Sequence, residues 1–361
     1  MSGLTNPVSH GCKKTAAIIH GNTFYHNMYK GCYMKIKKMT ALICSAVLFL
    51  SGCSGLTNKK DQIYTDTLFD TVISVQIFDP VDKSVIDGCR KLCQEYDAKF
   101  SRTNKDSEIS QINNAKGKFV EVSDDTVTLL KKGIYYGDMS KGLFDITIGS
   151  VSKLWDFPAE KPSVPSSKKV RAARNHVNYR NIMIVDNKVK LTDRKASLDV
   201  GGIAKGYIAD RLKDYLVSKN VRHAIINLGG NVLTLGTKTD GSKYNIGIQR
   251  PFDESGEPIT SVKVAGKSVV TTGTYQRYFE KKGKFYHHIL SPNTGYPCKN
   301  SLSSVTIITD SSLTADAMST TCFLLGYEEG MKLVNLLDNV DAVFITDDNE
   351  IHYSDNFLKK K

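Results

Sequence analysis

A glycine-rich turn that contains one lysine, residues 199–207 (DVGGIAKGY), could bind a phosphate group. Glycines let the backbone approach a ligand closely, the start of a helix favours an anion, and Lys205 adds a positive charge. The spacing matches neither of the common nucleotide-binding glycine motifs, so a tight strand-to-helix turn with an exposed lysine is an open alternative. We regard the segment as a candidate phosphate site.

A second cluster, residues 314–321 (TADAMSTT), could bind a divalent cation. Asp316 and Thr320 are four residues apart on a predicted helix, which places a carboxylate and a hydroxyl on one face. Oxygen ligands of this kind suit Mg²⁺, which uses one or two carboxylates and completes its shell with other oxygens. An aspartate in the first turn also stabilises a helix end, so helix capping is the alternative.

Two adjacent histidines, His287 and His288, lie within residues 286–295 (YHHILSPNTG). Neighbouring side chains of a strand point to opposite faces, so only one of the two can face a given ligand directly. The pKa of histidine lies close to neutral pH, which allows it to act as a general base. Surface histidines without a catalytic role are the alternative.

The composition is that of a globular enzyme-sized chain. Of its 361 residues 40% are hydrophobic and 9 are prolines, so it can bury one large core or two joined subdomains. The net charge of +12 could suggest a nucleic-acid partner, but residues 1–53 contain six lysines and no acid, which leaves +6 elsewhere. Because the remaining basic residues are mixed with acids, we expect no nucleic-acid partner.

The N-terminal part has the pattern of an export signal. Basic residues from Met34 (MKIKKM) come before the apolar run TALICSAVLFL and the small residues SGC, as in a secretory signal peptide. The apolar run is about half the ~20 residues that span a bilayer, which argues against a membrane helix. Residues 50–53 (LSGC) resemble a bacterial lipobox, in which Cys53 would receive lipid.

These signals predict a lipid-anchored protein on the extracytoplasmic face of the cell membrane. The predicted organisation is an over-extended start (1–33), a signal peptide (34–52), a polar tether (53–62) and a globular domain (63–361). Besides the lipidated Cys53, four cysteines remain after cleavage, at positions 89, 93, 298 and 322. Their spacing does not suit a metal site, so they are expected to be buried or free thiols.

The periodicity of the chain predicts an α+β fold. Strands are expected at residues 64–78, 182–191 (a hairpin), 224–235 (broken by two glycines), 304–309 and 342–346. Helices are expected at residues 81–100, 124–139, 206–218, 315–325 and 327–337. Residues 158–167, rich in proline and serine, are expected to form a surface loop. Since the order shows no regular βαβ alternation, a doubly wound sheet is disfavoured.

Taken together, the motifs resemble those of the FAD:protein FMN transferase family, also called ApbE. The following segments occur in the order and spacing that are typical of the family: GLFDITIG, LWDF, DVGGIAKGYIAD, INLGGN, TTGTYQRYF, YHHILSPNTGYP and ADAMSTT. The resemblance spans about residues 67–346. It implies mixed sheets flanked by helices, arranged as two interlocked subdomains, and makes residues 63–361 the FMN transferase domain.

The resemblance also implies roles for individual residues. It places Mg²⁺ on the Gly202 carbonyl, Asp316 and Thr320, and it leaves Ser319 where many relatives have a second acid. It places the catalytic histidine at His287, with His288 as the second choice. It places FAD against Phe69, Thr103, Leu143, Phe144, Asp145, Asp199, Lys205 and Ile289. Several relatives have Met-Gly-Thr in place of residues 69–71 (FDT) and an aromatic residue in place of Thr103.

The implied reaction transfers FMN from FAD to a Thr or Ser hydroxyl of an exported or membrane flavoprotein and releases AMP. Mg²⁺ and Lys205 would neutralise charge on the pyrophosphate, and a histidine would take the proton of the hydroxyl. Two alternatives are an Mg²⁺-dependent FAD pyrophosphatase, in which water replaces the acceptor, and a flavin-binding lipoprotein without catalysis. A pure carrier would have no use for a base beside a metal site.

Overall fold

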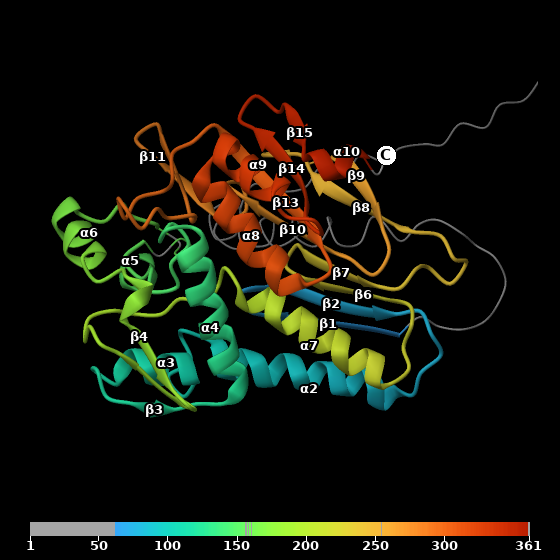
Figure 1. The fold of residues 1–361 in the computed structure, drawn as a ribbon, viewed down its shortest axis with the longest axis horizontal. Helices are drawn as coiled ribbons and strands as arrows, with labels where there is room; N and C mark the ends of the chain where they lie inside the picture. The colour runs from blue at the N-terminus through green and yellow to red at the C-terminus, as the bar shows by residue number, and fades with distance from the viewer. Residues whose placement is uncertain (1–61, 156, 158, 160, 254, 360–361) are drawn as a thin grey trace, which may run out of the picture. The chain divides into compact units, whose positions relative to one another are not determined.

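The main element of the fold is an antiparallel sheet with the strand order β1-β2-β6-β7-β10-β13-β14-β15 (Figure 1). The computed structural model describes residues 62–155, 157, 159, 161–253 and 255–359. The strands of this sheet are β1 (Gln62–Leu68), β2 (Thr71–Ile77), β6 (Ala224–Leu228), β7 (Asn231–Leu235), β10 (Ser268–Gly273), β13 (Leu302–Thr309), β14 (Asp341–Thr346) and β15 (Ile351–Tyr353).

Both faces of this sheet are covered near its centre, and every residue of β13 is buried. Val305 and Ile307 belong to the largest hydrophobic core, which includes residues of α7 (Ala204–Ser218) and α8 (Ser312–Leu325). Ile308 belongs to a second core together with the hairpin of β8 (Tyr244–Gln249) and β9 (Pro258–Val264). Alternate residues of β13 thus enter different cores, as the twofold period of a strand requires.

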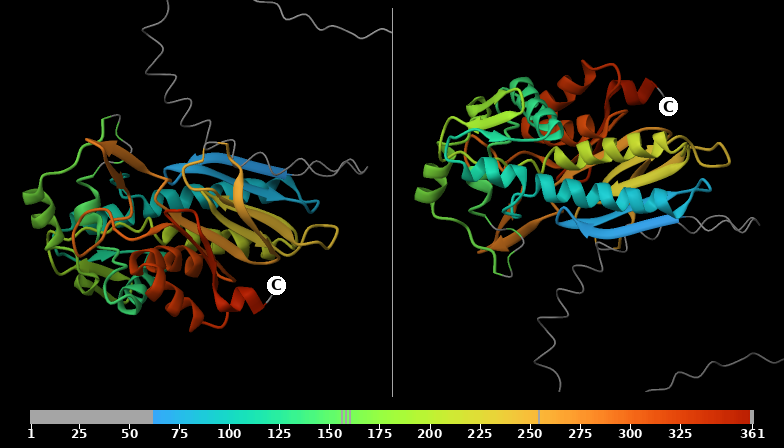
Figure 2. Two further views of the ribbon diagram at one scale, coloured as in Figure 1. Left: turned by 90° about the horizontal axis from the view of Figure 1, so that it is seen from above. Right: turned by 90° about the horizontal axis from the view of Figure 1, so that it is seen from below.

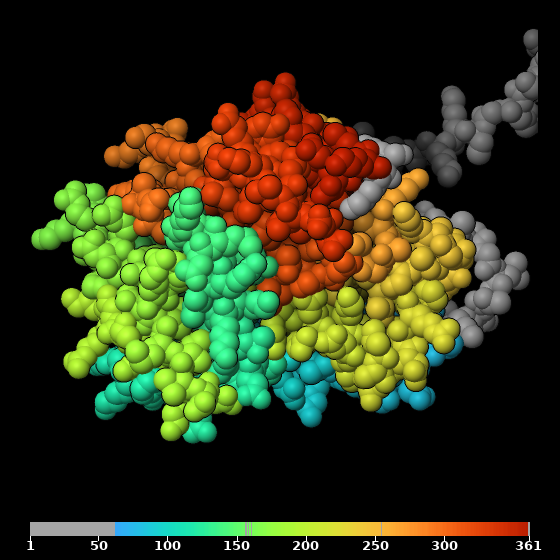
Figure 3. Space-filling view, in the orientation of Figure 1, coloured from blue at the N-terminus to red at the C-terminus, as the bar shows by residue number. Residues whose placement is uncertain are grey.

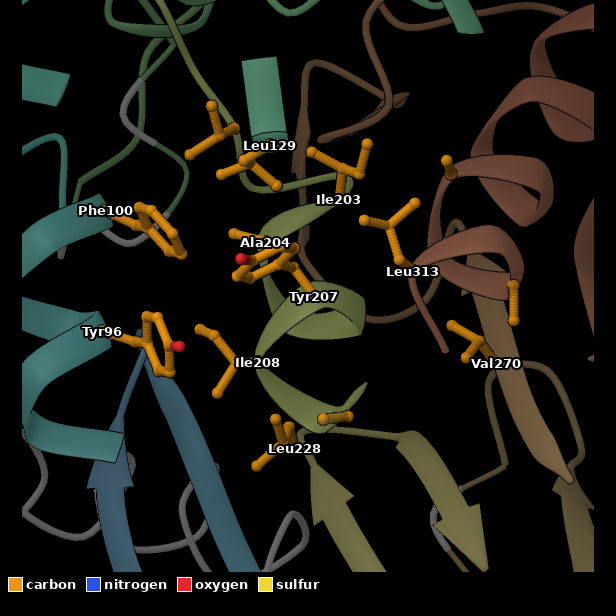
Figure 4. Packing of buried hydrophobic residues seen from close by; sticks show 14 of the residues in the cluster. Tyr96, Phe100, Leu129, Ile203, Ala204, Tyr207, Ile208, Leu228, Val270 and Leu313 are labelled. Carbon is orange, nitrogen blue, oxygen red and sulfur yellow. The ribbon is translucent and has the colours of Figure 1, made fainter. Parts of the chain in front are cut away.

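Helices on the first face fix the position of the glycine turn. α2 (Lys83–Phe100) and α7 lie side by side along the sheet (Figure 2), and α8 packs against α7, β10 and β13. Figure 4 shows Tyr207 of α7 with Tyr96 of α2 on one side and Leu313 of α8 on the other. Because the first turns of α7 are buried in this way, the turn before it is held in place.

The start of α8 is fixed by two side chains. The Ser311 hydroxyl accepts a 3.2 Å hydrogen bond from the backbone N–H of Thr314. Asp210 of α7 accepts hydrogen bonds from the backbone N–H groups of Ser312 (2.8 Å) and Leu313 (3.0 Å). These contacts satisfy N–H groups that have no partner within the helix, and α8 therefore begins three residues earlier than the sequence pattern predicts.

A smaller sheet in the order β3-β5-β4 lies with several helices in a second part of the fold. Its strands and the helices of this part are β3 (Val120–Glu121), β4 (Ile182–Val185), β5 (Lys188–Leu191), α3 (Glu108–Asn114), α4 (Asp124–Met139), α5 (Gly149–Ser152), α6 (Ser167–Arg174) and the short helix Tyr179–Asn181. The remaining elements are β11 (Tyr278–Lys281), β12 (Lys284–His287), α9 (Tyr327–Asn335) and α10 (Asp355–Lys359).

The two parts share one core. Leu129 of α4 and Val189 of β5 belong to the same buried cluster as Ile307 of the large sheet, and α4 contacts α8. Figure 3 shows α4 beside the C-terminal helices on one face. The predicted α+β fold of mixed sheets flanked by helices is confirmed.

Two predictions about elements need correction. Residues 64–78 form the two strands β1 and β2, because Phe69 and Asp70 make a turn at which both residues have φ of 56°. The serine-rich end of the predicted loop 158–167 begins α6, whose first turn is capped by the Ser166 hydroxyl. The sequence pattern also gave no indication of α3, α5, β11 or the β8–β9 hairpin. The strand expected to carry both histidines is β12, which ends at His287, so His288 lies just beyond it.

The predicted start, signal peptide, lipidated Cys53 and tether (1–62) lie outside the described residues, except that Gln62 begins β1. All described residues belong to one compact unit, Gly52–Lys361. Among the helices of the described part, none has the length and apolar character needed to span a membrane. The four cysteines 89, 93, 298 and 322 are free thiols, as predicted.

Candidate active site

The glycine turn and the start of α8 meet at a buried carboxylate. Asp316, 3% exposed, accepts a 2.9 Å hydrogen bond from the backbone N–H of Gly206. Its other oxygen lies 3.6 Å from Lys205 Nζ, which also donates a 3.0 Å hydrogen bond to the Gly201 carbonyl. Lys205 therefore joins the predicted phosphate-binding turn to the predicted metal ligand.

The other predicted metal ligands lie beside Asp316. Thr320 is one helical turn further along α8, and its hydroxyl lies 3.0 Å from the hydroxyl of Thr272 on β10. Gly202 faces this threonine, since a Cβ added at position 202 would lie 3.8 Å from Thr320 Oγ1. The structure thus brings together a carboxylate, a hydroxyl and the Gly202 backbone, which are hard oxygen donors of the kind that Mg²⁺ binds.

Two further observations bear on a metal at this place. The set contains one carboxylate, and no group of three His, Cys, Asp or Glu side chains with metal-binding geometry occurs among the described residues. Ser319 is buried, and its hydroxyl lies 2.8 Å from that of Thr272 and donates to the Asp316 carbonyl at 3.0 Å. A single ion bound by Asp316, Thr320 and a backbone carbonyl fits these donors, whereas Ser319 adds no charge.

His287 is a buried residue whose two ring nitrogens are both engaged. Nδ1 accepts a 3.3 Å hydrogen bond from the backbone N–H of Ile289, so Nε2 carries the proton and donates to the Cys298 carbonyl at 3.0 Å. Burial lowers the pKa of His287 below its usual value. The ring therefore stays neutral and holds the end of the β11–β12 hairpin against the segment around Cys298.

His288 is half-buried and has a different environment. Its backbone N–H and its Nδ1 both lie within hydrogen-bond distance of the Arg277 carbonyl, at 3.0 and 3.3 Å. Because Nδ1 is then the protonated nitrogen, Nε2 keeps its lone pair, and no described residue donates a hydrogen bond to it. Burial and the nearby charges of Arg277 and Lys205 lower the pKa of His288 to about 3.

Of the two predicted catalytic histidines, His288 thus has the nitrogen lone pair that a base needs. His287, the first choice from the resemblance, has its lone pair occupied by the Ile289 N–H. The assignment of either residue as the base stays a prediction.

The predicted FAD contacts at residues 143–145 form a turn that reaches the glycine turn. Phe144 is buried, and a Cβ added at Gly202 would lie 3.4 Å from its ring. Both carboxylate oxygens of Asp145 accept hydrogen bonds, from Thr147 on one side and from the Tyr179 N–H on the other. Burial raises the pKa of this carboxyl. Asp145 therefore orders the turn, and the half-buried Leu143 precedes Phe144 in it.

The remaining predicted FAD contacts lie around this centre. Asp199 accepts hydrogen bonds from the Gly201 N–H (3.1 Å) and the Ser152 hydroxyl (2.7 Å), and it lies 3.7 Å from Arg102 Nε. Arg102 precedes Thr103, which is exposed in a turn with Ser101. The hydrogen bonds of Thr103 join it to Ser101, and it is the neighbouring Arg102 that lies against Asp199.

Phe69 and Ile289 are brought toward the histidines through the backbone. Asp97 accepts a 3.0 Å hydrogen bond from the Phe69 N–H, and Arg277 donates one of 3.1 Å to the Asp70 carbonyl. Arg277 is also the residue whose carbonyl faces His288. Ile289 itself is buried and contributes its N–H to His287.

Sequence reasoning missed three residues of the site. Thr272 joins the hydroxyls of Ser319 and Thr320, Arg277 joins the β1–β2 turn to His288, and Arg102 pairs with Asp199. The motif TTGTYQRYF contains the first two, but its residue types gave no chemical reason to select them. Only their contacts across the fold reveal what they do.

Comparison with known proteins places this chain in a family. The ApbE family profile matches residues 69–344. A protein named FAD:protein FMN transferase from Klebsiella pneumoniae (strain 342) is 35% identical over 299 residues, which are 82% of this chain and 92% of that protein. One of the same name from Treponema pallidum (strain Nichols) is 28% identical over 342 residues, which are 89% of this chain and 93% of that protein.

The fold leads to the same family. The solved structure of the ApbE protein from Thermotoga maritima MSB8 has a TM-score of 0.76 at 29% identity and covers 83% of this chain and 99% of that one. The flavin transferase ApbE from Vibrio cholerae has a TM-score of 0.74 at 25% identity, with the same coverage. The chain therefore belongs to the ApbE family and is a transferase.

Proposed function

We propose that this chain is an FAD:protein FMN transferase that moves FMN from FAD to a Thr or Ser hydroxyl of another protein and releases AMP. The observation that carries the proposal is the contact between Lys205 and Asp316, which brings a phosphate-binding turn together with hard oxygen donors. The names of the relatives support the same reaction.

Gly202, Asp316 and Thr320 would hold one Mg²⁺ ion at this site. When bound, the ion would neutralise negative charge on the FAD pyrophosphate, which is the main requirement of phosphoryl transfer. Thr272 keeps the Thr320 hydroxyl in place through their 3.0 Å hydrogen bond. Asp316 is oriented by the Gly206 N–H, so the carboxylate is in position before any ligand arrives.

Lys205 acts on the phosphate groups directly. Its ammonium is held by Asp316 and the Gly201 carbonyl at the opening of α7, where a helix start also favours an anion. A point charge fixed in this way stabilises the charge that develops on the phosphoryl oxygens as AMP leaves.

His288 is the base in this proposal. The acceptor hydroxyl oxygen bonds to the FMN phosphorus while the bond from that phosphorus to the AMP oxygen breaks. The hydroxyl proton passes to His288 Nε2, whose lone pair is available because Nδ1 faces the Arg277 carbonyl. Residues 287 and 289 hold the segment that carries His288 through the hydrogen bond between them.

The acceptor and the location belong to the same proposal. The export signal and the lipobox around Cys53 support a lipid anchor that keeps the enzyme at the extracytoplasmic face of the membrane. The acceptor would then be an exported or membrane flavoprotein with a reachable Thr or Ser.

Product analysis tests the proposed reaction. The full chain is incubated with FAD, Mg²⁺ and an exported flavoprotein of the same organism, and AMP and free FMN are separated by chromatography. We expect AMP to form in step with FAD loss only when the acceptor is present, and to stop when Mg²⁺ is chelated. Equal amounts of AMP and free FMN without acceptor would support the pyrophosphatase instead, and FAD that stays intact would support a carrier.

A further inference from the structure

A hollow of about 620 Å³ lies beside the active site and contains none of the residues assigned above to FAD, the metal or the base. Its walls come from α3, α5, α6 and residues 194–198, and α5 and α6 are in contact with each other. These elements lie in the second part of the fold (Figure 1). Hollows of this size are typical of sites for small organic ligands.

The rim of the hollow is strongly basic. Five cationic side chains and one histidine line it, and none of its described lining residues is acidic: Arg102, Lys153, Lys169, His176, Arg194 and Lys195. Within the described residues, Lys153, Lys169, Arg194 and Lys195 have no carboxylate partner within 4.0 Å. Like charges around a concave surface repel one another, and a bound anion offsets that repulsion.

The floor of the hollow differs from its rim. Ala196 and Leu198 are buried, at 3% and 1% exposure, and Leu154 also lines the hollow. Asn113 is fixed there by two hydrogen bonds to the backbone of Leu198, of 3.1 and 2.6 Å. The hollow thus combines an apolar, ordered floor with a cationic rim, which suits a ligand that has a ring or sugar as well as phosphate groups.

We propose that this hollow is a second ligand site, which binds an organic phosphate of nucleotide size. The phosphates pair with the lysines and arginines of the rim, and the organic part lies against the floor formed by Leu154, Ala196 and Leu198. A site for inorganic phosphate alone would leave this floor unused, and an extended acidic peptide would not need it.

Arg102 links this site to the active site. Arg102 is one of the residues that line the hollow, and its Nε lies 3.7 Å from Asp199. The Asp199 carboxylate also accepts hydrogen bonds from the Ser152 hydroxyl and from the Gly201 N–H of the glycine turn. A phosphate in the hollow competes with Asp199 for Arg102. If Asp199 contacts FAD, which rests on the proposed function, then each ligand changes the affinity for the other by the same factor.

Calorimetric titration of the full chain, saturated with FAD and without Mg²⁺ or acceptor, tests the site with ADP as the probe. We expect one ADP to bind per chain without release of FAD. The double variant Lys153→Glu/Lys169→Glu should weaken ADP binding about tenfold or more, since it removes two charged contacts. The control Lys131→Glu/Lys238→Glu makes the same charge change at exposed lysines outside the hollow and should alter the affinity less than threefold, by roughly the long-range charge effect alone.

Three results would overturn the proposal. ADP could displace FAD instead of binding beside it, or the control could weaken ADP binding as much as the test variant. Inorganic tripolyphosphate, or a poly-glutamate peptide, could also bind as tightly as ADP, which would show that the apolar floor does not contribute to ligand binding. Because the titration involves no FMN transfer, its result does not depend on whether the proposed reaction is correct. The link through Asp199 is tested separately with Arg102→Gln, in which ADP and FAD should no longer change each other's affinity.

Discussion

Lys205 Nζ lies 3.6 Å from the carboxylate of Asp316, and the N–H of the next residue, Gly206, donates a 2.9 Å hydrogen bond to the same carboxylate. Two adjacent residues at the start of α7 thus hold Asp316 of α8, Lys205 through its charged side chain and Gly206 through a backbone hydrogen bond. This contact depends on how closely the two helices approach, and it joins the two motifs that the sequence suggested separately for phosphate and for metal.

The close approach at Gly206 predicts a specific sensitivity. A Cβ at this position would lie 2.3 Å from the Ser312 carbonyl oxygen and 2.7 Å from Leu313 Cα, so Gly206→Ala must push α8 away. We expect a loss of about 1–3 kcal/mol of unfolding free energy, as in other overpacked sites, together with loss of transfer. Chemical denaturation measures it. Gly201→Ala is the control, since a Cβ added there would lie 3.2 Å from the Asp199 side chain and meet no backbone atom within 4 Å outside its chain neighbours. A Gly206→Ala variant as stable as the wild type would contradict the packing argument.

Substitution of His288 and of His287 should affect different properties, the transfer rate in one case and the stability of the fold in the other. His288→Ala should lower the transfer rate by about 100-fold or more, the usual contribution of a general base, and leave the melting temperature nearly unchanged. His287→Ala should instead destabilise the fold by about 1–3 kcal/mol, because it leaves the buried Ile289 N–H and Cys298 carbonyl without a partner. Steady-state rates and thermal melts distinguish the two. The reverse pattern would assign the base to His287.

The depressed pKa of His288 predicts an unusual response to pH. Burial lowers its pKa from 6.5 to about 3, so the folded chain keeps this ring neutral between these values while the unfolded chain protonates it. The unfolded state therefore binds more protons, and stability falls as the pH is lowered below 6.5. In urea unfolding at pH 7.5 and 5, His288→Gln should lose less stability than the wild type. The transfer rate should not fall as the pH is lowered through 6.5, because His288 stays neutral there. A clear fall near pH 6.5 would contradict the depressed pKa of His288.

The β1–β2 turn predicts a stabilising change. Phe69 and Asp70 both have φ of 56°, a left-handed conformation that non-glycine residues adopt at a cost. Asp70→Gly should raise the unfolding free energy by roughly 0.5–1 kcal/mol, and the hydrogen bond from Arg277 to the backbone carbonyl is retained. Thermal melting measures the change. Asp70→Ala, which keeps a Cβ and removes the polar side chain that tolerates this conformation, should show no gain.

Local patterns in the sequence predicted much of the fold. α4 occupies the predicted residues 124–139, with Ser123 as its cap, and the hairpin of β4 and β5 lies at the predicted 182–191. In each case the signal is local, since a cap, an apolar stripe or a turn residue lies within the element itself. The β1–β2 turn was missed because neither Phe69 nor Asp70 is the glycine that usually marks such a turn.

The site was predictable as a set of residue types but not as an arrangement. The spacing of Asp316 and Thr320 indicated a shared helix face, and the structure places Gly202 and Lys205 against that face. The family resemblance ranked His287 ahead of His288, but the residue types themselves could not distinguish the two. That distinction depends on the Cys298 and Arg277 carbonyls, which come from other segments of the chain. Thr272 likewise acquires its role only through the contact of β10 with α8.

The most direct test of the central claim is the intact mass of the acceptor protein. The full chain is mixed with FAD, Mg²⁺ and an exported flavoprotein of the same organism, and mass spectrometry follows the acceptor for the wild type and for Asp316→Asn. The proposed function predicts that the wild type adds one FMN to the acceptor, that chelation prevents the addition, and that Asp316→Asn slows it about 100-fold, or about 2.7 kcal/mol in the barrier. An acceptor of unchanged mass, in a reaction that consumes FAD, would contradict the transferase, and an unaffected Asp316→Asn would contradict the site.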